Sequence, residues 1–201
     1  MIAAGRRTGF SNYLGWQVAK AAEIAKSHHY PTPLTLQPQC NLLVRDIEFE
    51  IVPACIDADI GLLPWGPLGG GWLSGKYRRD VMPSGTTRLG ENPDRGVEAF
   101  GPRNAEEQTW RVIATVETIA RSHDVSMSRV ALAWLVDRPA VTSVILGART
   151  ADQLDENLKS DAFELSAEDI ASLDAVSAPR ISPYPYGTGV FWNHKVEGPR
   201  S

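Results

Sequence analysis

The fold is decided by residues 46–65, which read DIEFEIVPACIDADIGLLPW. The first part of this stretch carries apolar side chains at three- and four-residue spacing, namely Ile47, Ile51, Val52, Cys55 and Ile56. This spacing predicts a helix, and Asp46 can accept a hydrogen bond at its N-terminus as a cap. Residues 60–65 are a short apolar run entered through Gly61, which predicts a strand covered on both faces. A helix that leads into a buried strand indicates a parallel α/β fold.

The same alternation of helix and strand extends in both directions from this stretch. Further strands are expected at residues 34–37 and 141–146, and further helices at 15–28, 104–122, 126–138, 150–159 and 166–176. Ser126 begins one of these helices, and Ser166-Ala-Glu-Asp169 resembles a capping box at the start of another. The glycine-rich segment 66–103 is expected to be irregular, and so is the tail 178–201. The sequence therefore predicts one α/β domain over residues 1–201.

Composition and charge exclude several classes of protein. The 201 residues are 43% hydrophobic and 22% charged, the balance of an ordinary globular domain. A net charge of −4 provides no field that would attract nucleic acid or anionic lipid. Cys40 and Cys55 are too few for a disulfide scaffold, and no apolar run is long enough to span a membrane. We therefore expect a cytoplasmic enzyme or ligand-binding domain without a bound metal.

Polar or glycine-rich loops follow the expected strands, at residues 11–12, 37–41, 65–71 and 147–149. Ligands of parallel α/β folds bind beyond the carboxyl ends of the strands, so these loops are the candidate binding site. Each loop also has a simpler explanation by itself. Ser11-Asn12 can be a helix cap, Trp65 a core side chain and Arg149 a solvated surface residue. Gln37 is less easily explained in this way, because an amide buried in an apolar strand needs hydrogen-bonding partners.

One glycine-rich motif in this region is misleading. Residues 70–77, GGWLSGKY, match a phosphate-binding P-loop only as far as Lys76. Tyr77 stands where Ser or Thr must reach magnesium, and Trp72 would crowd a loop whose backbone amides surround phosphate. We therefore assign no P-loop to this chain.

Taken together, the loops form a pattern that none of them carries alone. Its motifs are Gly9-Phe-Ser-Asn-Tyr13, Leu36-Gln-Pro-Gln-Cys-Asn-Leu-Leu43, residues 65–77, Val144-Ile-Leu-Gly-Ala-Arg149 and Gln153-Leu-Asp-Glu-Asn157. In this order and spacing they resemble the aldo-keto reductases over roughly residues 3–179, and the bacterial branch that is similar to potassium-channel β subunits most of all. The resemblance implies an oxidoreductase that uses NADP(H) to reduce aldehydes or ketones, built on a TIM-type (β/α)8 barrel.

The resemblance also implies which residues hold the nicotinamide end of NADP(H). Ser11, Asn12 and Gln37 would hydrogen-bond the carboxamide, which offers one acceptor and two donors. Trp65 would stack on the nicotinamide ring. The loop along the pyrophosphate would consist of Gly66, Pro67, Leu68 and Gly69. Two basic residues, Lys76 and Arg88, would belong to a loop that folds over the cofactor.

The adenosine 2′-phosphate and the adenine would lie at a second group of residues: Gly147, Arg149, Gln153, Glu156 and Asn157. The planar guanidinium of Arg149 suits a phosphate, and the helix that begins near Thr150 adds a favourable N-terminal dipole. Arg149 and the basic loop are the reason to prefer NADP(H) over NAD(H).

The family's catalytic set lies before the Ser-Asn motif and consists of an Asp, a proton-donating Tyr, a Lys and a His. Only ten residues precede Ser11. The chain is therefore expected to be truncated to strands five to eight of the barrel with their helices, and to hold no catalytic residue. Residues 4–9, AGRRTG, are shorter than the family pattern and lack apolar side chains, which argues against a regular first strand.

Three functional hypotheses follow. The first is an NADP(H)-dependent reductase that keeps the cofactor half of the site and has little or no turnover alone. The second is a non-catalytic NADP(H)-binding or protein-interaction module, and the third is a decayed gene product. Because half a barrel leaves sheet edges and an apolar face open, a covering partner is expected, either a second copy of the chain or the other half of the barrel.

Overall fold

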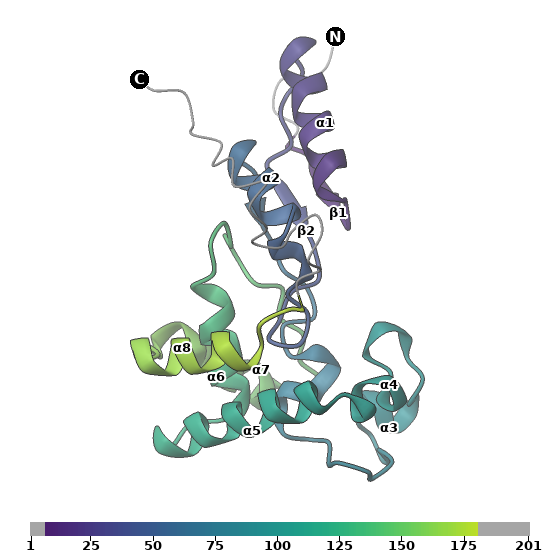
Figure 1. Cartoon of the computed structure of the whole chain (residues 1–201), viewed down its shortest axis with the longest axis vertical. Coiled ribbons are helices and arrows are strands. Elements are labelled where there is room, and N and C mark those ends of the chain that lie inside the picture. Colours follow the sequence, from purple (N-terminus) through teal and green to yellow (C-terminus); the bar gives the residue numbers. More distant parts are fainter. Residues whose placement is uncertain (1–6, 181–201) are drawn as a thin grey trace, which may run out of the picture.

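Three short parallel strands form the sheet of the computed structural model, which describes residues 7–180 (Figure 1). They are β1 (Gly9–Ser11), β2 (Thr35–Gln37) and β3 (Gly61–Leu62), in the order β1-β2-β3. Ser11 of β1 pairs with Gln37 of β2, and Thr35 pairs with Gly61 of β3. The predicted α/β class with a parallel sheet is confirmed, and all three strands end at the same edge.

Strand β1 corrects the expectation that the first strand would be irregular. The strand forms, but it begins at Gly9 and so does not include the basic residues Arg6 and Arg7. A Cβ atom at residue 9 would collide with the Thr35 hydroxyl, so only glycine allows β1 to lie this close to β2. Phe10 supplies the apolar side chain and stacks on Tyr13 with ring centroids 4.3 Å apart. Residues 1–6, including the first three residues of the doubtful segment 4–9, lie outside the described residues.

Residues 141–146 were predicted to form a strand, but in the structure they do not form one. They run parallel to β3 and form one bridge, between Val141 and Leu62. The amide of Thr142 donates to the carbonyl of Leu62 at 2.9 Å, and that of Ile145 to the carbonyl of Pro64 at 2.9 Å. Pro64 has no N–H, so the ladder cannot continue regularly along this edge.

Helices α1 (Gly15–Ser27) and α2 (Ile51–Asp57) accompany the sheet at one end of the molecule (Figure 1). The helix expected from residue 46 is divided, with a 3-10 turn at Asp46–Glu48 before α2. Asp46 makes no capping hydrogen bond, which corrects its predicted role. Pro53 is tolerated only in the first turn of a helix, so α2 begins at Ile51. The predicted buried stripe holds for Cys55, but Ile56 is 58% exposed.

The glycine-rich segment 66–103 is less irregular than predicted. It contains 3-10 helices at Gly69–Ser74 and Gly96–Glu98, and the short helices α3 (Arg88–Glu91) and α4 (Phe100–Ala105). Four of its buried side chains form a small core together with Ile113 of the following helix, namely Trp72, Tyr77, Leu89 and Phe100, whereas Leu73 belongs to the larger core. The segment is therefore a packed unit rather than an open loop.

The opposite end of the molecule is a layer of helices (Figure 1): α5 (Glu107–Ser122), α6 (Met127–Val136), α7 (Ala151–Leu158) and α8 (Ala167–Val176). The predicted caps are confirmed, since the Ser126 hydroxyl accepts a hydrogen bond from the amide of Arg129 and Ser166 forms a capping box with Asp169. Within residues 7–180, no helix is long and apolar enough to cross a membrane. The predicted irregular tail, residues 178–201, lies outside the described residues from residue 181 onward.

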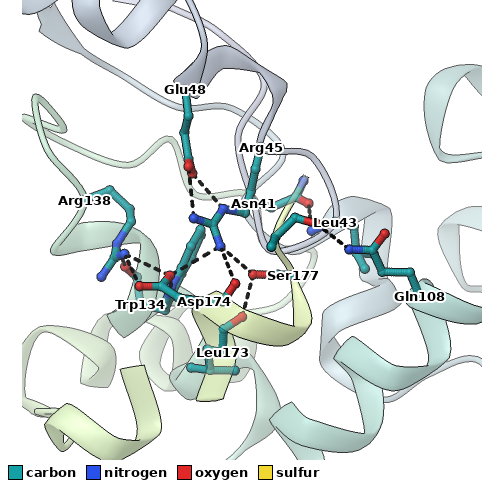
Figure 2. A network of polar contacts seen from close by, with 11 residues as sticks. Asn41, Leu43, Arg45, Glu48, Gln108, Trp134, Arg138, Leu173, Asp174 and Ser177 are labelled. Atoms are coloured by element: carbon teal, nitrogen blue, oxygen red, sulfur yellow. Dashed lines mark hydrogen bonds and ion pairs between the residues drawn. The ribbon is translucent and has the colours of Figure 1, made fainter. Parts of the chain in front are cut away.

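A polar network joins the helical layer to the loop after β2 (Figure 2). Asp174 of α8 accepts hydrogen bonds from Trp134 Nε1 at 2.9 Å and from Arg138 Nη1 at 3.1 Å. Arg45, which follows β2, lies 3.3 Å from the same carboxylate and donates to the carbonyl of Asp174 at 3.1 Å. Both guanidiniums also lie over the Trp134 ring, at 5.1 and 4.8 Å from its centroid. This network fixes α8 against the strand-bearing part of the chain.

Candidate functional site

Three predicted site residues meet where the strands end. Asn12 follows β1, Gln37 ends β2 and Trp65 follows β3. Trp65 Nε1 donates to Asn12 Oδ1 at 2.9 Å, and the amide of Asn12 donates to the carbonyl of Gln37 at 3.1 Å. Ser11 is the register partner of Gln37 and completes the group. We call these four residues the strand-end cluster.

The structure also tests the simple explanations of the residues in this cluster. Helix α1 is capped at Leu14, not at Ser11-Asn12, so the helix-cap explanation is wrong. Trp65 is only half-buried and its indole N–H is used on Asn12, which is unlike a core side chain. Gln37 is exposed, so the argument that a buried amide needs partners does not apply to it. Asn12 has a φ of 56°, a left-handed conformation that Asn tolerates better than most residues.

The predicted pyrophosphate loop, residues 66–69, continues from this cluster. Gly66 and Gly69 have φ values of 66° and 55°, in the region that favours glycine. The buried side chain of Asn41 contacts this loop, and its amide group donates to the carbonyl of Gly66 at 2.8 Å. Asn41 is 1% exposed and also accepts a hydrogen bond from the amide of Leu43, so its side chain fixes the loop to the chain after β2. The sequence motif contained Asn41, but nothing in its spacing revealed this role.

A buried carboxylate that the sequence analysis missed lies against the same loop. Glu98 is 7% exposed, and its Oε1 accepts a short hydrogen bond from Gln39 Nε2. A Cβ atom at residue 70 would lie 3.2 Å from Glu98 Cβ, so the glycine permits the close contact. Glu98 Oε2 is buried without a hydrogen-bond partner, and the nearest positive group is Arg103 Nε at 3.9 Å. Burial raises the pKa of Glu98 above its ordinary value, although Arg103, Arg88 and Gln39 act in the opposite direction.

The two basic residues predicted for the covering loop lie in different places. Lys76 is exposed and follows the 3-10 helix Gly69–Ser74, so the structure places it on the surface of segment 66–103. Arg88 is the first residue of α3 and its side chain passes close to Gly70, since a Cβ atom there would lie 3.7 Å from Arg88 Cδ. Arg88 is therefore next to the glycine loop, and Lys76 is not shown to be.

The predicted adenosine residues form a second cluster around the start of α7. The Arg149 amide donates to Gln153 Oε1 at 3.0 Å, and Thr150 caps the helix by accepting from the amide of Gln153. Gly147 precedes Arg149 on the exposed segment that follows residues 141–146. The guanidinium of Arg149 is bound to Glu91, with Nη1–Oε1 and Nη2–Oε2 distances of 2.8 and 2.7 Å. The Arg149 side chain is thus 50% exposed, in agreement with its explanation as a surface residue, and it is also paired with Glu91.

Glu156 and Asn157 lie about one turn after Gln153 in this helix. Arg129 Nη2 donates to both oxygens of Glu156, at 2.8 and 3.1 Å, and Lys159 Nζ lies 3.1 Å from Oε2. Hydrogen bonding from Ser126 contributes most to lowering the pKa of Glu156, so the carboxylate stays charged at neutral pH. Asn157 is 5% exposed. Glu156 is therefore fixed by α6, and Asn157 faces inward from α7.

One cavity, formed mainly by the loop after β2 and the start of the helical layer, is separate from both clusters. It has a volume of about 390 Å³ and is lined by residues of three segments, 39–46, 97–112 and 177–180, including Arg45 and Arg103. Both arginines are already paired with carboxylates. Within residues 7–180, no group of three His, Cys, Asp or Glu side chains could hold a metal ion. The strand-end cluster brings amide and aromatic groups together, and the Arg149 cluster holds a guanidinium beside the N-terminus of α7.

Comparisons with known proteins agree with the pattern of the strand-end loops. A family model described as the aldo/keto reductase family matches residues 5–178. Protein tas of Escherichia coli is 32% identical over 180 residues, which cover 90% of this chain and 50% of that protein. Versiconal hemiacetal acetate reductase of Aspergillus parasiticus is 28% identical, with coverages of 87% and 49%. A probable voltage-gated potassium channel subunit beta of Arabidopsis thaliana is 31% identical, with coverages of 76% and 45%. The chain spans about half the length of these relatives.

Proposed function

The chain belongs to the aldo/keto reductase family, and from that membership we propose that residues 7–180 bind NADP(H) along the carboxyl ends of their strands. By family, the nucleotide serves the reduction of aldehydes or ketones to alcohols. One observation carries the proposal. Asn12, Gln37 and Trp65, from the ends of three neighbouring parallel strands, are brought into one cluster in which Trp65 Nε1 lies 2.9 Å from Asn12 Oδ1.

The strand-end cluster suits the nicotinamide in the chemistry of its groups. When bound, the nucleotide supplies a hydride to a carbonyl carbon. The hydroxyl of Ser11 and the amides of Asn12 and Gln37 can satisfy the acceptor and two donors of a carboxamide. The half-buried indole of Trp65 offers a flat surface for the ring, and its hydrogen bond to Asn12 keeps it oriented.

The glycine loop suits a pyrophosphate. Positive φ values at Gly66 and Gly69 give a backbone that side chains would hinder, and small residues let backbone amides approach a phosphate closely. Asn41 holds this loop in place from the buried side. Pro67 and Leu68 belong to the same loop, and Arg88 and Lys76 supply positive charge on the segment that follows.

The Arg149 cluster suits the adenosine end, and it is the reason to propose NADP(H) rather than NAD(H). A guanidinium binds phosphate with a planar pair of donors, and the capped N-terminus of α7 favours an anion beside it. Gly147, Gln153, Glu156 and Asn157 would complete the pocket for the ribose and adenine.

We further propose that the parallel sheet is an arc of a (β/α)8 barrel, in which β1, β2, β3 and residues 141–146 correspond to strands five to eight. Because the chain spans about half the length of its relatives, we assign it nucleotide binding and expect turnover well below about 1 per second for the 201 residues tested alone. A second copy covering the open sheet and a cytoplasmic location stay predictions.

Titration of the purified chain with NADPH, followed by tryptophan fluorescence, tests the proposal. We expect saturable quenching with a dissociation constant in the micromolar range, and we expect Trp65→Phe to remove most of the signal. Trp16→Phe is the comparison variant, because Trp16 is 59% exposed on α1 and is not a member of the strand-end cluster.

Two results would contradict the proposal. One is the absence of saturable quenching for a chain that is folded by circular dichroism. The other is equal loss of signal in Trp65→Phe and Trp16→Phe, since the nucleotide would then not lie against Trp65.

A further inference from the structure

Arg149, the residue proposed to bind the 2′-phosphate, already has an anionic partner within the chain. Its Nη1 donates to Glu91 Oε1 at 2.8 Å and to the carbonyl of Thr86 at 2.6 Å, and its Nη2 donates to Glu91 Oε2 at 2.7 Å. Both terminal nitrogens of the guanidinium are thereby engaged by segment 86–91. A phosphate that binds Arg149 through the same pair of nitrogens would have to take the place of Glu91.

Glu91 is the last residue of the short helix α3, which is held in place by packing and by a cap. Leu89 is fully buried in the small core with Trp72 and Tyr77. The Thr87 hydroxyl accepts a hydrogen bond from the amide of Gly90 at 3.0 Å, which closes the first turn of α3. A Cβ atom at residue 90 would lie 2.5 Å from the carbonyl of Ser84, so the turn is packed tightly against residues 84–85. The position of Glu91 next to Arg149 is therefore built into segment 66–103.

The charge of Glu91 decides what this contact does to a ligand. The hydrogen bond from Arg149 lowers the pKa of Glu91, so its carboxylate is charged at neutral pH. A 2′-phosphate at Arg149 would meet this negative charge at close range, which costs binding free energy. A 2′-hydroxyl carries no charge and can donate to a carboxylate, as the ribose of NAD does to an acidic residue in dinucleotide-binding folds.

We propose that Glu91 is a specificity-determining residue of the adenosine site: it competes with the 2′-phosphate of NADP(H) for Arg149 and narrows the preference for NADP(H) over NAD(H). The inference rests on the proposed function, because it takes Arg149 as the 2′-phosphate ligand. NADP(H) binds by exchanging its phosphate for the Glu91 carboxylate, whereas NAD(H) binds without breaking the Arg149–Glu91 pair.

The test compares NADPH and NADH binding to the full chain and its Glu91→Gln variant, by isothermal titration calorimetry at fixed ionic strength. Glu91→Gln keeps the size of the side chain and removes its charge. We expect the dissociation constant for NADPH to fall by about threefold to tenfold, the range of a lost surface ion pair together with a lost like-charge contact. The dissociation constant for NADH should stay within about twofold or rise.

Glu107→Gln is the matched control. Glu107 forms a similar exposed pair with Arg79, with Nη1–Oε1 and Nη2–Oε2 distances of 3.3 and 2.5 Å, and the variant changes the net charge by the same amount. Unchanged NADPH affinity in Glu91→Gln, or an equal gain in Glu107→Gln, would overturn the inference.

Arg149→Ala separates this inference from the proposed function. If the chain binds NADPH and Arg149→Ala weakens NADPH more than NADH, the proposed function holds, and the result for Glu91→Gln then decides the inference alone. If Arg149→Ala weakens both nucleotides equally, Arg149 is not the 2′-phosphate ligand and the inference is wrong while nucleotide binding stands. If the chain binds neither nucleotide, both are wrong.

Discussion

The helical layer and the open sheet are built in different ways. In α6, every residue from 130 to 135 is buried, and α6 and α8 both pack against α5. In β1, by contrast, two of three residues are exposed, and β3 is only two residues long. The layer thus places its side chains in the core, whereas the sheet directs several of them to its carboxyl edge.

This difference separates stability from binding. Buried apolar side chains of the helical layer contribute to the free energy that holds the fold, since the hydrophobic effect scales with the area removed from water. The strand ends contribute few buried atoms, and their polar groups are positioned by backbone pairing. Substitutions at the strand ends should therefore change binding with little cost in stability, and substitutions in α6 should do the reverse.

The largest expected effect comes from two tryptophans that lie one in each region. Trp134 is fully buried in α6, donates to Asp174 and lies beneath two guanidiniums, so Trp134→Ala should lower the free energy of unfolding by about 3–5 kcal/mol. Trp65→Ala should cost less than about 1.5 kcal/mol, because the side chain is half-buried and loses one hydrogen bond. Urea unfolding followed by circular dichroism measures both. Equal losses would mean that the strand ends carry as much of the stability as the helices.

The two regions also differ in how far the sequence predicts them. The helices of the layer follow local signals, because a cap and a periodic apolar stripe lie within one short stretch, and Ser126 and Ser166 act as predicted. Strand pairing is non-local. Neither the start of β1 at Gly9 nor the failure of residues 141–146 to form a strand could be predicted, because both depend on neighbours, the Thr35 hydroxyl and Pro64, that a local pattern does not include.

The candidate site shows the same limit. The meeting of Asn12, Gln37 and Trp65 was predictable, since parallel strands end at one edge. The Glu91–Arg149 pair joins residues 58 apart in the sequence, and the contact between Glu98 and Gln39 joins residues 59 apart. No spacing rule connects such positions, so only the folded structure of segment 66–103 reveals them.

A smaller effect is expected at the cap of α8, which tests whether local signals stabilise the layer. The Ser166 hydroxyl accepts a hydrogen bond from the amide of Asp169 at 3.1 Å, and Asp169 accepts one from the amide of Ser166 at 3.2 Å. Ser166→Ala removes the first of these and should lower the free energy of unfolding by about 0.5–2 kcal/mol. Ser172→Ala, at an exposed position of the same helix, should stay within about 0.5 kcal/mol of the wild type. A loss of the same size in both variants would show that the box does not stabilise α8.

The smallest expected effect is a change in pH dependence at Glu98, which is packed against the glycine loop. Because burial raises the pKa of Glu98 in the folded state, the folded chain holds this proton more tightly than the unfolded chain does. The stabilising contribution of the protonated form is complete below the ordinary pKa of 4.5 and is lost as the pH rises through the folded-state pKa. Glu98→Gln abolishes this titration, so the variant should gain stability relative to the wild type between pH 4.5 and pH 8.

Urea unfolding of the wild type and Glu98→Gln across this pH range measures the difference. Glu106→Gln is the control, because Glu106 Oε2 lies 3.6 Å from the same Arg103 but its side chain is 59% exposed. If Glu98→Gln and the wild type keep a constant difference from pH 4.5 to pH 8, the Arg103 and Gln39 contacts offset the burial of the carboxylate completely. Burial of the unpartnered Oε2 would then not lower the free energy of unfolding, and the ionised Glu98 carboxylate would be as favourable next to the glycine loop as it is in water.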